Sequence, residues 1–125
     1  MTPQARVAAA IDVLDTVLDG DPAEKTLTNW ARKNRYAGSK DRAAVRDFVF
    51  DALRQKRSAA QQGKAMTGRG LMIGLLRLGG QDPSEMFTGQ GYASPVLSAD
   101  EAGAPPGLDT ADEGVRLDCP DWLLP

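Results

Sequence analysis

Histidine is absent from this chain of 125 residues, and Cys119 is its single cysteine. Without histidine the chain lacks the commonest metal ligand and the commonest acid–base catalyst. Zinc chemistry, Ser-His-Asp hydrolysis and Cys-His catalysis are therefore excluded for the chain acting alone. One cysteine cannot build an intramolecular disulfide framework, and it is typical of a reducing compartment. Acidic neighbours disfavour the thiolate of Cys119, so we expect an inert thiol there.

Long apolar runs and an export signal are also missing. No apolar run reaches the roughly 18 residues of a transmembrane span, and residues 1–6 lack a basic-then-apolar pattern. A cytoplasmic protein without a membrane partner is the expectation. Gly68, Gly70 and Gly74 follow no strand and precede no Gly-Lys-Ser/Thr, so we interpret them as sites of close helix packing and not as a phosphate loop. We predict no catalytic, metal-binding or cofactor-binding residue in this chain.

The net charge of −2 conceals an uneven distribution of charged residues. Residues 1–80 carry 14 Lys/Arg and 8 Asp/Glu, a net of +6, whereas residues 81–125 carry 1 Lys/Arg and 9 Asp/Glu, a net of −8. Such asymmetry indicates a body that binds a polyanion, followed by an acidic segment.

Periodic apolar residues predict an all-α fold with four principal helices. The first covers residues 3–19, begins with Thr2 as its cap and Pro3 at its first position, and stops at Gly20. The second covers about residues 22–34. The third covers about residues 40–61, with Ser39 as its cap. The fourth, at residues 67–78, is apolar nearly all round, which predicts a central core helix.

The sequence changes character after residue 80. Residues 82–87 predict a short helical turn, and Ser98 with Glu101 resembles a capping box over another. We therefore expect a helical core over residues 1–80 and an irregular acidic segment of short helices or linker over residues 81–117. Pro120 and Trp122 then resume an apolar pattern, so we expect residues 118–125 to begin a further region of a longer protein.

The third helix carries the main functional pattern. At 100° per residue, Arg42, Arg46 and Arg57 share one edge with Phe50, and Arg54 lies further round. An arginine edge with an aromatic suits contacts to phosphates and stacking on bases. The alternative is that these arginines cover the core or form ion pairs with acids of the first helix. Those acids are Asp12, Asp15 and Asp19.

A second basic group brackets the turn before the third helix, beside Tyr36. Its members are Arg32, Lys33, Arg35 and Lys40. They either add phosphate contacts or form an ordinary solvated helix end that complements the helix dipole. The candidate RNA-binding residues are therefore Arg32, Lys33, Arg35, Lys40, Arg42, Arg46, Arg54 and Arg57.

Three segments resemble one known family. Residues 40–54, with the pattern Asp-Arg…Val-Arg…Leu-Arg, and residues 69–79, ending Leu-Arg-Leu-Gly, resemble two helices of the NusB-like domain. That domain is N-terminal in bacterial RNA (cytosine-5) methyltransferases of the RsmB/Sun family. Residues 118–125 are similar to the Pro-x-Trp-Leu entry into the family's catalytic half, so the resemblance implies that they begin a missing catalytic region. The family's late Ala-Val-Asn-Glu-Ala-Val helix has no counterpart, so the resemblance implies a shortened NusB-like bundle.

The resemblance also implies a function. It predicts a module that binds rRNA and positions it for the C-terminal methyltransferase domain of the same protein, which would use S-adenosylmethionine. Two alternatives remain open. One is a transcription antitermination factor of the NusB type, and the other is a helical protein-docking domain whose arginines pair with acids.

Overall fold

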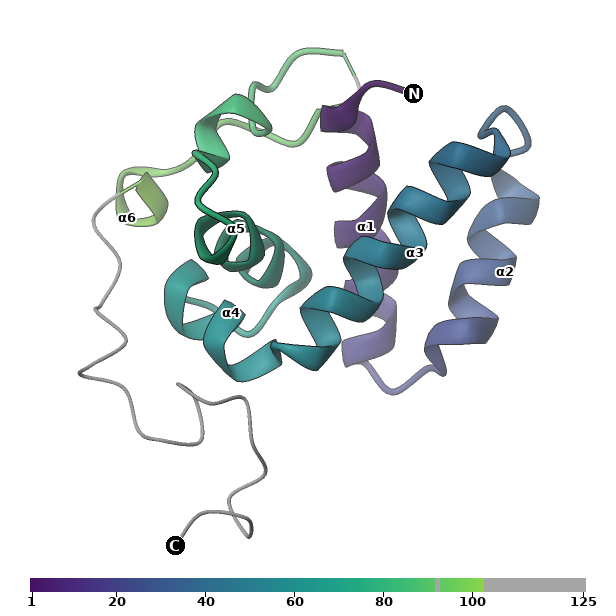
Figure 1. The fold of residues 1–125 in the computed structure, drawn as a ribbon, viewed down its shortest axis with the longest axis horizontal. Helices are drawn as coiled ribbons and strands as arrows, with labels where there is room; N and C mark the ends of the chain where they lie inside the picture. The colour runs from purple at the N-terminus through teal and green to yellow at the C-terminus, as the bar shows by residue number, and fades with distance from the viewer. Residues whose placement is uncertain (92, 103–125) are drawn as a thin grey trace, which may run out of the picture.

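The computed structural model of this chain describes residues 1–91 and 93–102. Within them the regular structure is helical and contains no strand, which confirms the all-α class. The principal helices are α1 (Pro3–Leu18), α2 (Ala23–Lys33), α3 (Ser39–Arg54), α4 (Lys56–Gly63) and α5 (Gly68–Leu78) (Figure 1). A short 3-10 helix, η1 (Pro83–Glu85), and the four-residue α6 (Ala99–Ala102) follow. The rest of the predicted acidic segment, residues 103–117, and the predicted start of a catalytic region at residues 118–125 lie outside the described residues.

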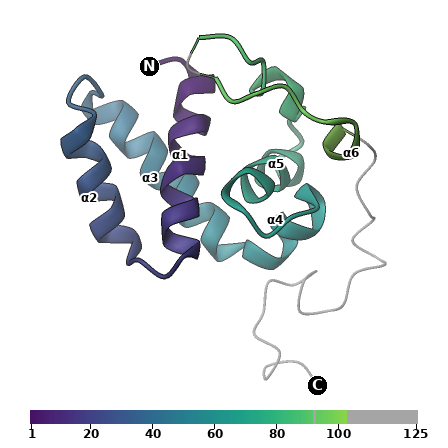
Figure 2. The same cartoon turned by 180° about the vertical axis from the view of Figure 1, so that it is seen from behind.

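Helix α1 lies between the α2–α3 hairpin and α5 (Figure 2). Its start follows the sequence prediction, because the Ala5 amide donates a hydrogen bond of 3.1 Å to the Thr2 hydroxyl and Pro3 occupies the first turn. Gly20 adopts a φ of +118°, which suits glycine and ends the helix. Between these two ends, α1 packs against α2 and α3 on one side and against α5 on the other.

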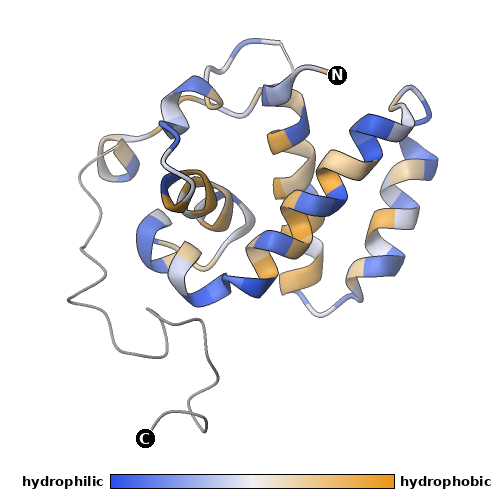
Figure 3. Ribbon diagram, in the orientation of Figure 1, coloured by the Kyte–Doolittle hydropathy of each residue, from blue (hydrophilic) through white to orange (hydrophobic). Residues whose placement is uncertain are grey.

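The core is built from α1, α3 and α5, and α5 has a hydrophobic colour over much of its length (Figure 3). This confirms that α5 is the central core helix. The side chains that are at most 1% exposed include Val7, Ala10, Leu14, Val45, Val49, Ala52, Leu71, Met72 and Ile73. Phe87, which follows η1, is also 1% exposed and joins this cluster. Residues past position 80 thus help to close the core.

The third predicted helix is wrong in its length and its cap. It begins one residue early, because the Asp41 carboxylate accepts the Gly38 amide hydrogen at 3.2 Å and makes Gly38 the cap. It ends at Arg54, because Gln55 leaves the helical region with φ −110° and ψ 31°. A straight helix over residues 40–61 would extend about 33 Å. The bend instead packs α4 against α5 and buries Ala59.

Glycines allow α4 and α5 to approach each other closely. A Cβ atom on Gly63 would overlap the backbone carbonyl of Gly70, and one on Gly74 would overlap that of Ala59. These contacts support the interpretation of the glycines as packing sites.

No helix in the described part of the chain combines the length and apolarity required to cross a membrane.

Candidate nucleic-acid interface

Five cationic side chains gather where α2 ends and α3 begins. They are Arg32, Lys33, Arg35, Lys40 and Arg42, and we call them the basic turn. All five are exposed. Among residues 1–91 and 93–102, no carboxylate forms an ion pair with any of them. Five of the eight predicted RNA-binding residues are therefore exposed around this turn and without ion-pair partners in the described structure. Lys33 lines the α1–α2 side and Arg42 the α2–α3 side.

Backbone hydrogen bonds and one buried alanine hold the basic turn in place. The Asn34 side-chain amide donates to the Trp30 carbonyl at 2.9 Å and so caps the end of α2. The Ala37 amide donates to the Asn34 carbonyl at 2.9 Å, and the Ala37 side chain is only 2% exposed. The backbone of the turn is thus anchored next to the end of α2 and in the core.

The acid nearest to the basic turn is held by another helix. Arg6 of α1 donates from Nε to Asp41 Oδ1 at 2.8 Å, and its Nη2 lies 2.7 Å from the same oxygen. The hydrogen bond from Arg6, together with the Gly38 amide, lowers the pKa of the Asp41 carboxyl. Asp41 therefore stays ionised, and its charge is compensated by α1 and not by the basic turn.

Arg46 has a partner on α2. Its Nη1 and Nη2 donate to the two carboxylate oxygens of Glu24 at 2.9 and 2.6 Å. The hydrogen bonds lower the pKa of Glu24 and raise that of Arg46. The guanidinium also lies 4.9 Å from the centroid of the Phe50 ring, which covers the aromatic that the sequence predicted for stacking. The ion-pair partners predicted from the sequence were the acids of the first helix. The acid that pairs with Arg46 is instead Glu24 of α2.

A shallow hollow of about 230 Å³ lies between α2 and α3, and both Arg42 of the basic turn and Arg46 line it. Arg42 and Arg46 stand on its α3 side. The lining residues are Leu27, Thr28, Trp30, Ala31, Arg42, Ala43 and Arg46. The two predicted arginines of α3 thus share one concave surface, in which Arg42 has no ion-pair partner among the described residues and Arg46 is paired.

The remaining two candidates lie elsewhere. Arg54 ends α3, about 18 Å along the helix from Arg42, and pairs with Asp51 one turn earlier. Arg57 is on α4, beyond the bend at Gln55. The predicted continuous edge from Arg42 to Arg57 is therefore wrong, because the chain turns before Arg57.

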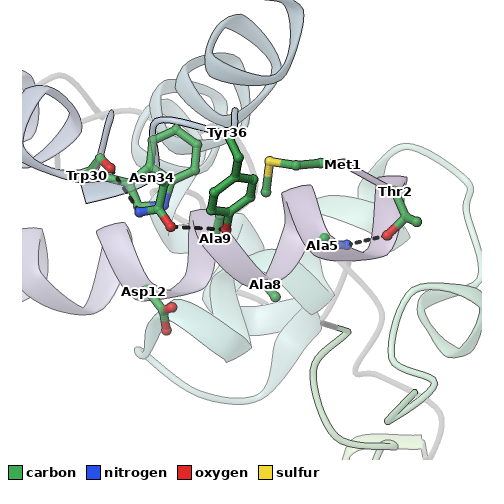
Figure 4. A pocket seen from close by; sticks show the side chains of 9 residues that line it. All are labelled: Met1, Thr2, Ala5, Ala8, Ala9, Asp12, Trp30, Asn34 and Tyr36. Atoms are coloured by element: carbon green, nitrogen blue, oxygen red, sulfur yellow. Dashed lines mark hydrogen bonds between the residues drawn. The ribbon is translucent and has the colours of Figure 1, made fainter. Parts of the chain in front are cut away.

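Sequence reasoning missed a pocket on the other side of α2, about 520 Å³ in volume (Figure 4). Trp30, Asn34 and Tyr36 form one side, and residues of α1 form the other. The lining residues are Met1, Thr2, Ala5, Ala8, Ala9, Asp12, Trp30, Asn34 and Tyr36. The sequence signal available was an aromatic residue, Tyr36, directly after Arg35 in a polar turn. Its exposure of 70% became known only from the structure.

Two further arginines stabilise the fold. Arg69 of α5 donates to both carboxylate oxygens of Glu101 at 2.7 and 2.9 Å and lies 4.8 Å from the Phe87 ring centroid. Arg77 donates to the backbone carbonyls of Gln62 and Glu101. Ser98 and Glu101 form the predicted capping box. These contacts hold residues 93–102 against α5.

Within the described ranges, no three carboxylate or thiol side chains converge in a way that could hold a metal ion. Comparison with models of known protein families, with curated proteins and with solved structures gives no match. The functional interpretation therefore depends on the geometry of this chain.

Proposed function

We propose that this chain is an RNA-binding module with a shortened NusB-like bundle. In this proposal it positions rRNA for a methyltransferase domain of the same protein, which transfers a methyl group from S-adenosylmethionine to cytosine C5. The basic turn is the observation that carries the proposal, because it places five exposed cations without ion-pair partners around one turn of the described chain. Phosphate contacts of this kind supply most of the affinity of a nucleic-acid module.

Replacing Arg35 and Arg42 by glutamine tests this role. Both side chains are exposed and without ion pairs in the described structure, so their loss should not disturb the fold. We expect weaker binding to an rRNA hairpin with an unpaired loop. The plot of log affinity against log salt should flatten by roughly 0.7–0.9 for each lost phosphate contact.

Lys56→Gln provides the matched control, because Lys56 is exposed at the start of α4 and outside the predicted site. It should leave the slope unchanged. Equal slopes for the wild type, the double variant and the control would overturn the assignment of the basic turn.

A protein-docking domain is the second candidate, and the ion pairs of Arg46 and Arg54 favour it. These pairs indicate that acids already satisfy part of the arginine surface. A docking domain predicts no retention of RNA even at low salt, where phosphate binding is strongest.

An antitermination factor of the NusB type would use the same RNA surface without a methyltransferase domain. Deletion of the gene distinguishes the two. Loss of a 5-methylcytosine from rRNA supports the methyltransferase module, whereas intact methylation with altered transcription termination supports the factor.

A further inference from the structure

The pocket between α1 and the basic turn has the dimensions of a small-ligand site. Its volume of about 520 Å³ lies within the range of roughly 300–1,000 Å³ that is common for such sites. Ala5, Ala8 and Ala9 of α1 line it with short side chains that leave room for a flat guest (Figure 4). The pocket is therefore large enough to hold one planar group of the size of a nucleobase.

Two aromatic side chains favour a planar ligand. Trp30 is half-buried at one end, and Tyr36 stands beside it with 70% of its surface exposed. Exposed aromatics next to cations are the usual stacking platforms for unpaired bases. Tyr36 directly follows Arg35 of the basic turn, so one short segment offers both a ring and a charge.

The polar groups of the pocket suit the edge of a base. The Asn34 amide donates to the Trp30 carbonyl at 2.9 Å and accepts from the Tyr36 hydroxyl at 3.0 Å. One N–H and one lone pair of the amide remain for a ligand, the pair of groups that matches an adenine edge. Asp12 lines the same pocket, and its carboxylate accepts from exocyclic amino groups but repels phosphate. A neutral base therefore fits better than an anion.

The backbone of an RNA has a path to this pocket. Arg35 stands between two of the lining residues, Asn34 and Tyr36, while Arg32 and Lys33 immediately precede them. A strand whose phosphates contact the basic turn can thus direct a neighbouring base towards α1. We propose that the α1–α2 pocket receives an unpaired base of the RNA, an inference that depends on the proposed RNA-binding function.

Single-stranded RNA containing one 2-aminopurine tests the inference with the full chain. Tyr36→Ala removes the ring, and we expect the variant to fold because Tyr36 is exposed. The affinity should fall roughly 5- to 150-fold, the cost of one lost stacking contact. Tyr36→Phe keeps the ring and should bind within about threefold of the wild type. The 2-aminopurine emission should change on binding to the wild type and to Tyr36→Phe only.

Ala8→Leu blocks the pocket without changing charge. Ala8 is half-buried on α1, and leucine is a good helix former, so the variant should fold. Its affinity for single-stranded RNA should fall as that of Tyr36→Ala does. A fully paired RNA duplex should bind equally to all these variants, because it offers no unpaired base.

The outcomes separate this inference from the proposed function. If the wild type binds no RNA at low salt, both fail. If RNA binds with a slope that depends on Arg35 and Arg42, while Tyr36→Ala and Ala8→Leu leave affinity and emission unchanged, the base pocket alone is overturned.

Discussion

Glu24 and Arg46 form a two-point ion pair between α2 and α3, with N–O distances of 2.6 and 2.9 Å. Both side chains are half-exposed or more, so water and salt can compete for either partner. In the proposed function, the carboxylate occupies the position at which an RNA phosphate would contact Arg46. When the pair is formed, the charge of Arg46 is neutralised by Glu24. When it is broken, Arg46 adds a cation beside the basic turn.

Glu24→Gln should release Arg46 for phosphate. If the proposed function is correct, affinity for the rRNA hairpin rises and the salt slope steepens by roughly 0.7–0.9, one additional contact. The thermal midpoint should change little, because an exposed pair adds little to stability. Combining Glu24→Gln with Arg46→Gln provides the control, since the gain requires the freed guanidinium. A gain that persists in the double variant would contradict this explanation.

Glu101→Gln should destabilise the attachment of residues 93–102 to α5. The two hydrogen bonds from Arg69 lower the pKa of Glu101 from 4.5 to about 2. A carboxyl whose pKa is lower in the folded state stabilises the fold above the unfolded pKa and loses this effect as pH falls towards 2. We expect a loss of roughly 1–2 kcal/mol at neutral pH.

Urea denaturation and amide exchange of residues 93–102 measure that loss. Wild type and Glu101→Gln should converge as the pH falls below about 2, where the Glu101 carboxyl becomes protonated in the folded state as well. Glu85→Gln is the matched control, because Glu85 is exposed and makes no ion pair within the described residues. An equal effect of the two substitutions would contradict a specific role for Glu101.

Asp12→Asn should stabilise the protein at neutral pH. Partial burial, followed by repulsion from Asp15, raises the pKa of the Asp12 carboxyl. The folded state then binds the proton more tightly than the unfolded state, so the charged carboxylate costs stability as pH rises through the folded pKa. The thermal midpoint of Asp12→Asn should exceed that of the wild type at neutral pH and equal it in strong acid. Asp47→Asn, on the exposed face of α3, should give no such gain.

Gly74→Ala should be severely destabilising. The added Cβ would overlap the backbone carbonyl of Ala59, and backbone on both sides prevents a cheap adjustment. We expect a loss of roughly 3 kcal/mol or more in urea denaturation, the upper end of overpacking effects. Gly79→Ala, just after α5, has only ordinary contacts at 3.6 Å and serves as the control. Similar stabilities would contradict the close contact between α4 and α5.

The local sequence determined where most helices begin and end. Thr2 with Pro3 starts α1, Thr67 caps α5 through the Gly70 amide at 3.0 Å, and Gly79 follows its last residue. These features act over a single turn, so the residue order is enough to predict them. The buried stripe of Val45 and Val49 is local in the same sense, because side chains three or four positions apart share a helix face.

Tertiary structure alone decided the remaining features. Gln55 ends α3 without glycine or proline because the bend lets α4 bury Ala59 against α5, a gain that no local propensity contains. Glu24 and Arg46 are 22 positions apart, and only the α2–α3 hairpin brings their charges within hydrogen-bond distance. The pocket beside Tyr36 likewise requires α1, whose lining residues precede Tyr36 in the sequence by more than 20 positions. Contacts of this kind depend on how helices pack. The sequence therefore predicted the cationic residues of α2 and α3, but it could not show that, among the described residues, Arg46 is paired and Arg42 is not.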